Sequence, residues 1–365
     1  MTTTPRAIDG VCAWQGRAME NDPRWRFTLS RDNIAEIHGA LAAVRQQGLA
    51  WDQMTKADFP LPGTAGLLAE MAEELENGSG LANLSGLPVT EFNDQNGGGL
   101  RHVWYGIGLN LGAPVFQDCN ALLMRDIQDE DRDTDALQGH ELTARDGSRF
   151  HSSKARTLSN SLLRFHTDRT DVVGLLCVRQ AKSGGVSRIA SSATVHNAML
   201  QRRPDLAALL YEPLHRARLG EERGGELLSY ALPVFGQVEG RFTSHYSRTY
   251  VEAAQEMLNV PRMDAAHWDA LDQLHDLAEE HCMEMTMRPG DMQFINNHVI
   301  YHARTAYEDH NNDHNDDQGG AGIDQRRLLH RLWLAMPNSR ALPEDHEVLW
   351  RNVAAGTVRG GIAQI

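Results

Sequence analysis

Apolar residues recur at helical spacing in the first part of the chain. Four of them stand three or four positions apart after Ser30, namely Ile34, Ile37, Leu41 and Val44. Because Ser is a preferred helix N-cap, this pattern predicts a helix over residues 31–47, and similar spacing predicts another over residues 64–75. From residue 81 to 89, short apolar runs are broken by Gly, Asn and Pro, which is typical of strands and turns. The β-rich part is expected to begin there.

A second helical region interrupts the strand pattern in the middle of the chain. Apolar spacing predicts helices over residues 193–200, 204–211 and 265–280, and strand texture returns at 283–288 and 292–295 on either side of a Pro-Gly-Asp turn. The polar stretches 126–148 and 310–322 are expected to be loops. There is no internal repeat. The chain is interpreted as a single domain, 1–365, with a helical N-terminal part (1–80) and a helical insertion (193–282).

Composition and charge narrow the class of protein. Of the 365 residues, 41% are hydrophobic and 23% are charged, as in a globular protein with a sizeable core. The formal net charge of -14 disfavours nucleic acid as a partner, since it repels phosphate backbones. A small-molecule substrate is expected instead, and whether the chain forms a homo-oligomer is left open.

The cysteines and the N-terminus bear on the compartment. Cys12, Cys119, Cys177 and Cys282 stand far apart with no CxxC pair, which predicts reduced and mostly buried thiols and no zinc knuckle. The chain shows no basic segment followed by an apolar stretch at its start, and no apolar run long enough to cross a bilayer. We therefore expect a cytoplasmic protein without a membrane partner.

One His-x-Asp motif follows an apolar run. Phe165 precedes His166-Thr167-Asp168, and a second apolar run begins at Val172. On a strand, residues i and i+2 face the same way, so His166 and Asp168 can share one cation. A third ligand from a distant strand would complete a facial triad, which suits non-haem iron(II) with open positions for a bidentate oxo-acid and O₂.

The same motif occurs twice more, so its spacing alone decides little. His267-Trp268-Asp269 falls in the helix predicted at 265–280, where residues i and i+2 diverge. His314-Asn315-Asp316 lies in the polar stretch 310–322 and is expected to be solvated. The context that strengthens a metal role for His166 and Asp168 is the run FINNHVIYHAR (294–304), which supplies a strand, an Asn-Asn turn and a histidine.

The histidines of this later run also allow a zinc site. His298 and His302 stand at i and i+4, which on a helix suggests a zinc pair. The glutamate of HExxH is missing, and the residues between the two histidines favour a strand. A hydrolytic zinc enzyme is therefore disfavoured.

Arginines in the final strand pattern point to an anion. In RRLLHRLWL, Arg327 and Arg331 share one strand face. A guanidinium embedded in a strand must find an anion or stay exposed, and it can grip a carboxylate through two parallel hydrogen bonds. An internal salt bridge is an equally good explanation of these arginines when they are considered without the other motifs.

Taken in order, these motifs resemble a known family. HTD (166–168), SGGVS (183–187), FINNxxxxHAR and RRxxxRLWL are similar to the taurine-dioxygenase-like branch of iron(II)/2-oxoglutarate oxygenases, which includes the clavaminate-synthase-like proteins. The likeness spans nearly the whole chain, with DFPLP (58–62) and GLPV (86–89) near its start and RGGI (359–362) near its end.

The resemblance implies an α+β fold whose core is a double-stranded β-helix (jelly roll). It implies Fe(II), 2-oxoglutarate as cosubstrate and O₂, with His166, Asp168 and His302 as iron ligands. Arg327 would pair with the far carboxylate of 2-oxoglutarate, helped by Ser187, with Arg326 and Ser191 as rivals. Arg331 would hold the other cosubstrate carboxylate or an anionic group of the substrate.

The function expected from this resemblance is hydroxylation or desaturation of a small carboxylate- or amine-bearing metabolite, with release of succinate and CO₂. The carboxylate of Asp168 argues against halogenation, because iron halogenases on this scaffold lack it. Two alternatives stand beside this expectation: a jelly-roll metal-binding protein and a cupin-like oxygenase that does not use 2-oxoglutarate. The segment 193–282 is expected, by analogy of fold, to contribute to a lid.

Overall fold

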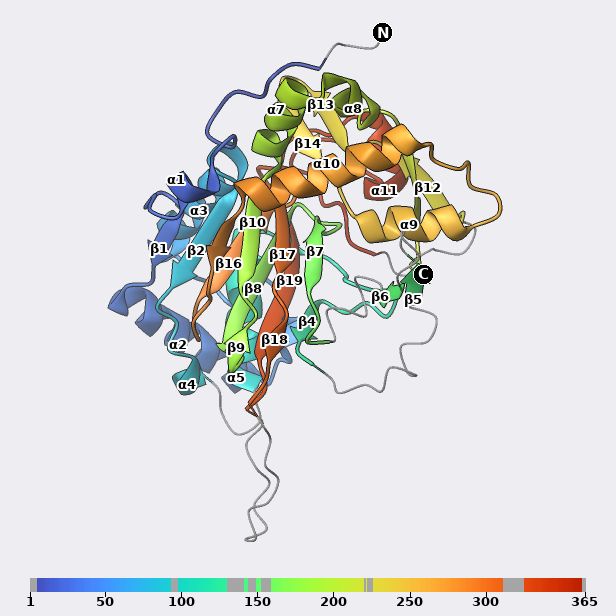
Figure 1. Cartoon of the computed structure of the whole chain (residues 1–365). Helices are drawn as coiled ribbons and strands as arrows, with labels where there is room; N and C mark the ends of the chain where they lie inside the picture. Colours follow the sequence, from blue (N-terminus) through green and yellow to red (C-terminus); the bar gives the residue numbers. More distant parts are fainter. Residues whose placement is uncertain are drawn as a thin grey trace.

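The computed structural model describes residues 5–92, 98–129, 141–143, 149–151, 159–219, 221, 226–310 and 325–362. Two β-sheets form the centre of this structure (Figure 1). The larger has seven strands: β1 (Arg26–Thr28), β2 (Leu81–Ser85), β16 (Met292–Asn296), β8 (Val172–Arg179), β19 (Leu328–Ala335), β3 (Ala113–Pro114) and β4 (Met124–Ile127). The smaller has four strands: β15 (Met283–Met285), β10 (Ser187–Ser191), β17 (Ile300–Arg304) and β7 (Leu163–His166).

A shared apolar core joins the two sheets. Val173 and Ile295 of the larger sheet lie in one buried cluster with Ile189 and Ile300 of the smaller sheet. Neighbouring strands run antiparallel except β1 and β2, which are parallel. Two antiparallel sheets packed over a common core are the architecture of a jelly roll, so the expected fold class is confirmed.

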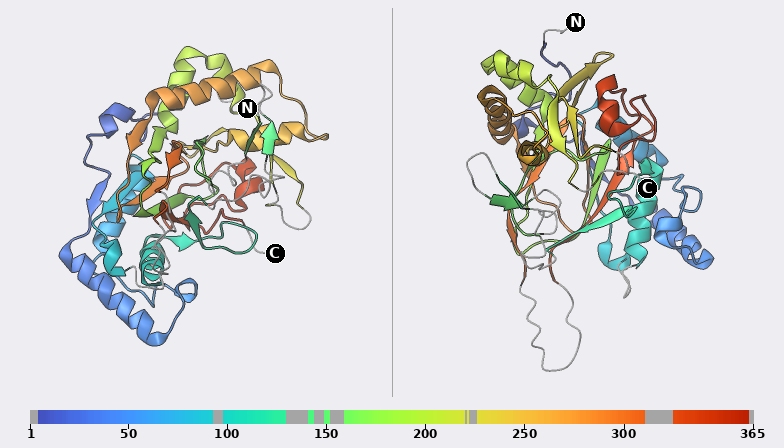
Figure 2. Two further views of the ribbon diagram at one scale, coloured as in Figure 1. Left: turned by 60° about the horizontal axis from the view of Figure 1, so that its bottom comes forward. Right: turned by 90° about the vertical axis from the view of Figure 1, so that its right-hand side faces the viewer.

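Helices cover the outer face of each sheet. The N-terminal helices α2 (Arg31–Gln47), α3 (Ala65–Asn77) and α5 (Gly98–Leu111) pack their apolar faces on the larger sheet. The helices α7 (Ser192–Arg202) and α10 (Ala265–His281) pack on the smaller sheet. Figure 2 shows the two groups on opposite sides of the strands. The remaining short helices are α1 (Gly16–Met19), α4 (Val89–Phe92), α8 (Pro204–Leu209), α9 (Arg248–Glu256) and α11 (Glu347–Trp350), with 3₁₀ turns at Trp51–Gln53 and Glu344–His346.

The predicted helix at 31–47 is confirmed to the residue. Ser30 accepts a hydrogen bond from the backbone N–H of Asn33, and the Asn33 side chain accepts one from the backbone N–H of Ser30, so the two form a capping box. Gly48 ends the helix in the left-handed region at φ 67°. The helices predicted at 64–75 and 265–280 are also present, within two residues at each end.

The segment 193–282 is less helical than expected. Two antiparallel hairpins lie within it: β11 (Leu214–Ala217) with β12 (Ser229–Leu232), and β13 (Phe235–Val238) with β14 (Arg241–Ser244). Each of these strands spans only four residues, which is the lower limit at which an alternating pattern indicates a strand. The description of this segment as a helical insertion is therefore wrong for its middle part.

Other expectations also need correction. Strands and turns are predicted over 81–89, but the strand β2 ends at Ser85 and Val89 already begins the helix α4. The stretch 126–148 was expected to be a loop, yet it contains the end of β4 and the strand β5 (Glu141–Thr143), which pairs with β6 (Arg149–His151). The stretch 310–322 lies outside the described residues except His310. The short strands β9 (Ser183–Gly184) and β18 (Tyr307–Glu308) pair with each other.

Two expectations about the whole chain have outcomes here. The four cysteines are free, but only Cys177 is buried, and Cys119 is exposed, so the prediction of mostly buried thiols is wrong. Among the described residues, no helix combines the length and apolar character needed to cross a membrane.

Candidate metal centre

Three sequence-predicted ligands meet between two paired strands. His166 ends β7, and its register partner on β17 is His302. Asp168 follows β7 by two residues, and its carboxylate oxygens lie 3.8 Å from His166 Nε2 and 3.9 Å from His302 Nε2. One ligand atom from each residue lies within 4.8 Å of the others. The pairing of β7 with β17 thus brings His302 close to His166 and Asp168, which precede it in the chain by 136 and 134 positions.

Hydrogen bonds orient the proximal ligands. The Asp168 Oδ2 atom accepts a hydrogen bond from Trp333 Nε1 at 3.0 Å and lies 3.5 Å from the Arg331 guanidinium. The backbone N–H of Asp168 donates to Asn297 Oδ1 at 2.9 Å. His166 Nδ1 lies 2.9 Å from the carbonyl oxygen of Arg164, which leaves Nε2 as its ligand atom.

The protonation states of the three side chains fit a divalent cation. Burial lowers the pKa of His302 to about 3 and also lowers the pKa of His166, so both imidazoles are neutral. Burial would raise the pKa of Asp168, but the Arg331 charge and the hydrogen bond from Trp333 hold it below its usual value. Two neutral imidazoles and one carboxylate on one side of a cation are the donor set of a facial iron(II) triad.

A pocket lies beside this centre, and Arg327 is one of its lining residues. Its lining includes all three ligands together with Ser187 and Arg327. Arg327 is buried, and its NH1 atom has no hydrogen-bond partner among the described residues. A buried guanidinium with an unsatisfied donor is suited to an anionic ligand.

The structure separates the rival residues by their surroundings. Ser191 caps α7 by accepting from the Thr194 N–H, and its hydroxyl donates to the Cys12 carbonyl oxygen at 2.5 Å. Arg326 NH1 donates to the carbonyl oxygen of Asp129 at 3.1 Å. Neither of these two side chains lines the pocket, whereas Ser187 and Arg327 do.

A zinc site formed by His298 and His302 is not compatible with the geometry. His298 lies in the turn before β17, and it contacts Asp171 Oδ1 through Nε2 at 2.8 Å and Thr243 Oγ1 through Nδ1 at 2.9 Å. Both ring nitrogens of His298 are therefore occupied by protein groups. His267-Trp268-Asp269 lies on α10 as predicted, and His314-Asn315-Asp316 lies outside the described residues.

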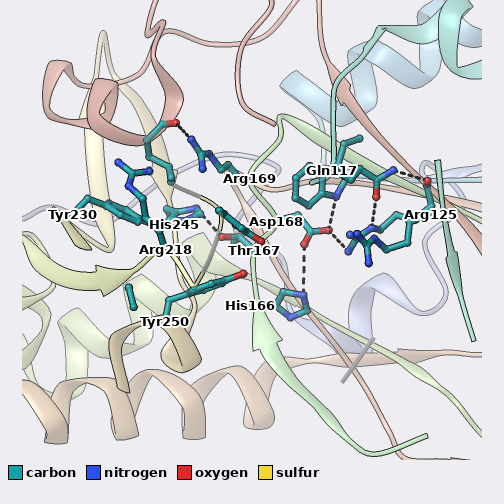
Figure 3. Close-up of a pocket in the computed structure, with 15 residues that line it drawn as sticks. Gln117, Arg125, His166, Thr167, Asp168, Arg169, Arg218, Tyr230, His245 and Tyr250 are labelled. Carbon is teal, nitrogen blue, oxygen red and sulfur yellow. Dashed lines mark hydrogen bonds and ion pairs between the residues drawn. The ribbon is translucent and has the colours of Figure 1, made fainter. Parts of the chain in front are cut away.

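A second cavity also includes His166 and Asp168 in its lining (Figure 3). It is strongly cationic, and its lining includes Arg125, Arg169, Arg218 and Arg331 with Gln117, Glu221, Tyr230, His245 and Tyr250. Residues from the segment 193–282 form one wall. Arg169 lines this cavity, whereas Arg164, Tyr105 and Tyr301 do not. Arg164 pairs with Glu252 at 2.7 Å, and Tyr105 and Tyr301 are buried in the cores.

Comparison with known proteins identifies the family. The sequence model of the taurine catabolism dioxygenase TauD, TfdA family matches residues 45–333. The chain belongs to this family. FR-33289 synthase of Streptomyces rubellomurinus is 30% identical over 343 residues, which are 93% of each chain. The chain is accordingly an iron(II)- and 2-oxoglutarate-dependent dioxygenase, as the order of its motifs implied.

Solved structures share the fold of this TauD, TfdA family member at low sequence identity. An asparagine oxygenase in complex with Fe(II), a hydroxyasparagine and succinate covers 92% of this chain and 100% of its own, with a TM-score of 0.59 and 14% identity. The non-heme iron oxygenase OrfP in complex with Fe and α-ketoglutaric acid covers 85% of this chain and 93% of its own, with a TM-score of 0.57 and 14% identity. Both likenesses support the jelly-roll assignment.

Proposed function

We propose that this dioxygenase hydroxylates a small carboxylate- or amine-bearing metabolite, with desaturation as the alternative outcome. In hydroxylation, one oxygen atom of O₂ enters the substrate C–H bond and the other enters succinate, while 2-oxoglutarate loses CO₂. The observation that carries the proposal is the position of the three metal ligands. All three line the pocket that contains Arg327, and His166 and Asp168 also line the cavity that is rich in arginine side chains. The asparagine oxygenase structure holds a hydroxylated amino acid, which is a small molecule that bears both a carboxylate and an amine.

Specific roles follow for the residues of the site. We assign iron to His166, Asp168 and His302, and the far carboxylate of 2-oxoglutarate to Arg327 with Ser187 beside it. Arg331 donates through Nε to Gln117 Oε1 at 2.7 Å, so its position is fixed before any ligand binds. From there it can hold the other cosubstrate carboxylate and keep Asp168 ionised.

Bound iron, 2-oxoglutarate and O₂ supply the oxidising power for the C–H bond. The chain's own contribution is to position that bond and to exclude water. Trp333 and Arg331 both approach Asp168 Oδ2, which leaves Oδ1 for the metal. The segment 193–282 closes one side of the cavity through Arg218, Tyr230 and Tyr250. We propose that this segment serves as the cover of the active site within a single domain.

The first experiment follows the visible charge-transfer band of the chelate. Anaerobic addition of Fe(II) and 2-oxoglutarate to the metal-free protein should produce the band, and Arg327→Ala should weaken 2-oxoglutarate binding by about 10–100-fold, because a charge-assisted pair is lost. Arg326→Ala is the matched control and should behave like wild type, since Arg326 lies outside the pocket.

Absence of the band in folded wild-type protein would reject the cosubstrate role. The jelly-roll binding protein or the cupin-like oxygenase would then be the better description. A band that weakens equally in both arginine variants would reject the assignment to Arg327 alone.

Gly185 provides an independent test of the Arg327 position. Its φ is +67°, and a Cβ atom there would lie 3.0 Å from Arg327 Nε. Gly185→Ala should therefore raise the KM for 2-oxoglutarate severalfold and destabilise the fold by about 1–2 kcal/mol through left-handed strain. Gly240→Ala is matched for strain, with φ +75° and no atom within 4 Å, and should cost stability without changing KM. Equal KM values in the two variants would contradict the proposed contact.

A further inference from the structure

Arg125 and Arg331, two of the four arginines in the cavity, have hydrogen-bonded acidic or amide partners. Arg125 pairs with Asp118 Oδ2 at 2.7 Å. Arg331 is held by Gln117 Oε1 at 2.7 Å and faces Asp168 Oδ2 at 3.5 Å. Neighbouring side chains therefore hold both guanidinium groups, although Arg125 Nε has no hydrogen-bond partner among the described residues.

Arg169 and Arg218 are held mainly by backbone carbonyl groups. Arg169 NH2 donates to the carbonyl oxygen of Leu349 at 3.0 Å, and Arg169 Nε has no hydrogen-bond partner among the described residues. Arg218 donates to the carbonyl oxygens of Leu227 and Val348 at 3.1 and 3.2 Å. Its NH1 atom lies 3.5 Å from Glu226 Oε2 without a hydrogen bond. Each guanidinium thus keeps a donor for a further acceptor.

Burial makes these donors expensive to leave unsatisfied. The exposed fractions of Arg169 and Arg218 are only 9% and 5%. Besides Asp168, Glu221 is the only carboxylate that lines this cavity among the described residues, against four arginines. Asp118 and Glu226 offset part of this charge from outside the cavity lining, so the case for a bound anion rests on the unsatisfied donors Arg169 Nε and Arg218 NH1.

Their position relative to the metal ligands suits one end of a substrate. Figure 3 shows Arg169 and Arg218 on one side of the cavity and Arg125 on the other, with Asp168 between them. The Arg218 guanidinium stacks 4.7 Å from the centre of the Tyr230 ring, which fixes its plane. A group held by these two arginines would leave the rest of the molecule free to extend toward His166 and Asp168.

We propose that Arg169 and Arg218 form the subsite for an oxyanion group of the substrate, a carboxylate, sulfonate or phosphonate. The subsite is separate from Arg327 and Arg331, which serve the cosubstrate. This inference rests on the proposed function and narrows it to substrates that carry an anionic end.

Calorimetric titration tests the subsite without turnover. Protein loaded anaerobically with Fe(II) and 2-oxoglutarate would be titrated with acetate, methanesulfonate and methylphosphonate at constant ionic strength. We expect saturable binding of at least one of these anions, and the ranking identifies the kind of oxyanion. Arg218→Gln and Arg169→Gln should each weaken it on the order of 10–100-fold, because one charge-assisted interaction is removed.

Arg203→Gln is the matched control for the loss of one positive charge. Arg203 pairs with Asp205 on the surface and does not line the cavity, so the variant should bind the anions like wild type. If Arg169→Gln fails to fold, Arg218→Gln and the wild-type titration still decide the question. Failure of all three anions to bind the wild type, or equal binding by wild type and Arg218→Gln, would overturn the subsite.

The charge-transfer band in the same samples separates this inference from the proposed function. A normal band with lost anion binding in Arg218→Gln supports the subsite. A missing band in the wild type would count against the cosubstrate site, while the anion titration would still report on Arg169 and Arg218.

Discussion

Replacing Asp168 with alanine is expected to abolish turnover of 2-oxoglutarate and substrate. The substitution removes the only carboxylate of the triad and leaves the Trp333 and Arg331 donors facing an empty position. Changing residues that only support metal ligands commonly costs about 10–100-fold in metal affinity or activity, so loss of a ligand should cost more. The measurement is iron content after anaerobic loading, together with succinate release.

Asp269→Ala is the matched control for this prediction. It removes the aspartate of a second His-x-Asp motif, which lies on α10 and takes no part in the metal group. We expect normal iron loading and normal succinate release in that variant. Full turnover by Asp168→Ala would refute the triad assignment, and equal losses in the two variants would indicate a general defect of the protein.

Local patterns in the sequence predicted the helices and the metal ligands for physical reasons. The helix at 31–47 has its cap, its apolar spacing and its final glycine within 19 consecutive residues, from Ser30 to Gly48. His166 and Asp168 precede a buried strand, and His302 lies within a run of strand-forming residues, so each position carried a local signal. Their meeting across the paired strands β7 and β17 could be expected only from the resemblance to a family.

The helix α5 shows where local pattern was insufficient. Its sequence GGLRHVWYGIGLNL contains four glycines, which disfavour a helix in isolation. In the structure, a Cβ at Gly106 would lie 2.3 Å from Phe59 Cδ1, and one at Gly108 would lie 2.7 Å from Leu332 Cδ1. The glycines allow α5 to approach its neighbours closely, so tertiary packing outweighs helix propensity.

Arg125 and Arg218 of the cavity are not predicted from the sequence, for a related reason. Arg125 lies within the short strand β4 and Arg218 directly follows β11, and alternation with apolar residues there is also typical of solvated side chains. Their burial depends on the segment 193–282 and on strands far away in the sequence. By contrast, Ser191 carries a local signal for a structural role, because it is the N-cap of α7 and accepts a hydrogen bond from the backbone N–H of Thr194. That signal would have favoured Ser187 for the cosubstrate.

Asp171 is the residue whose change should cost the most stability. It is 1% exposed, and its Oδ1 atom accepts from His298 Nε2 and Arg359 Nε, each at 2.8 Å. Its Oδ2 atom accepts from the Met336 backbone N–H at 3.0 Å. Arg359 belongs to the RGGI motif near the end of the chain, so this carboxylate ties that motif to the strand that follows the metal ligands.

Asp171→Asn should therefore lower the free energy of unfolding by about 3–5 kcal/mol, because the buried Arg359 loses its anionic partner and the new amide places its own donors against others. Urea unfolding followed by circular dichroism at neutral pH measures the change. Asp205→Asn, which removes the charge of the exposed pair with Arg203, should leave the free energy of unfolding almost unchanged, because solvent screens this pair. A loss below 1 kcal/mol in Asp171→Asn would show that the network is not essential to the fold.

Substitutions of Asp168 and Asp171 should therefore affect different properties, metal binding and stability, although the two residues stand three positions apart. Folded Asp171→Asn should still give the charge-transfer band at low temperature, because His166, Asp168 and His302 are unchanged. Asp168→Ala should lose the band while its unfolding free energy changes much less, since Arg331 keeps Gln117 as a partner. Loss of the band in folded Asp171→Asn would mean instead that the Asp171 network also sets the spacing of the metal ligands, through the Asn297 N–H that donates to the Asp171 carbonyl oxygen.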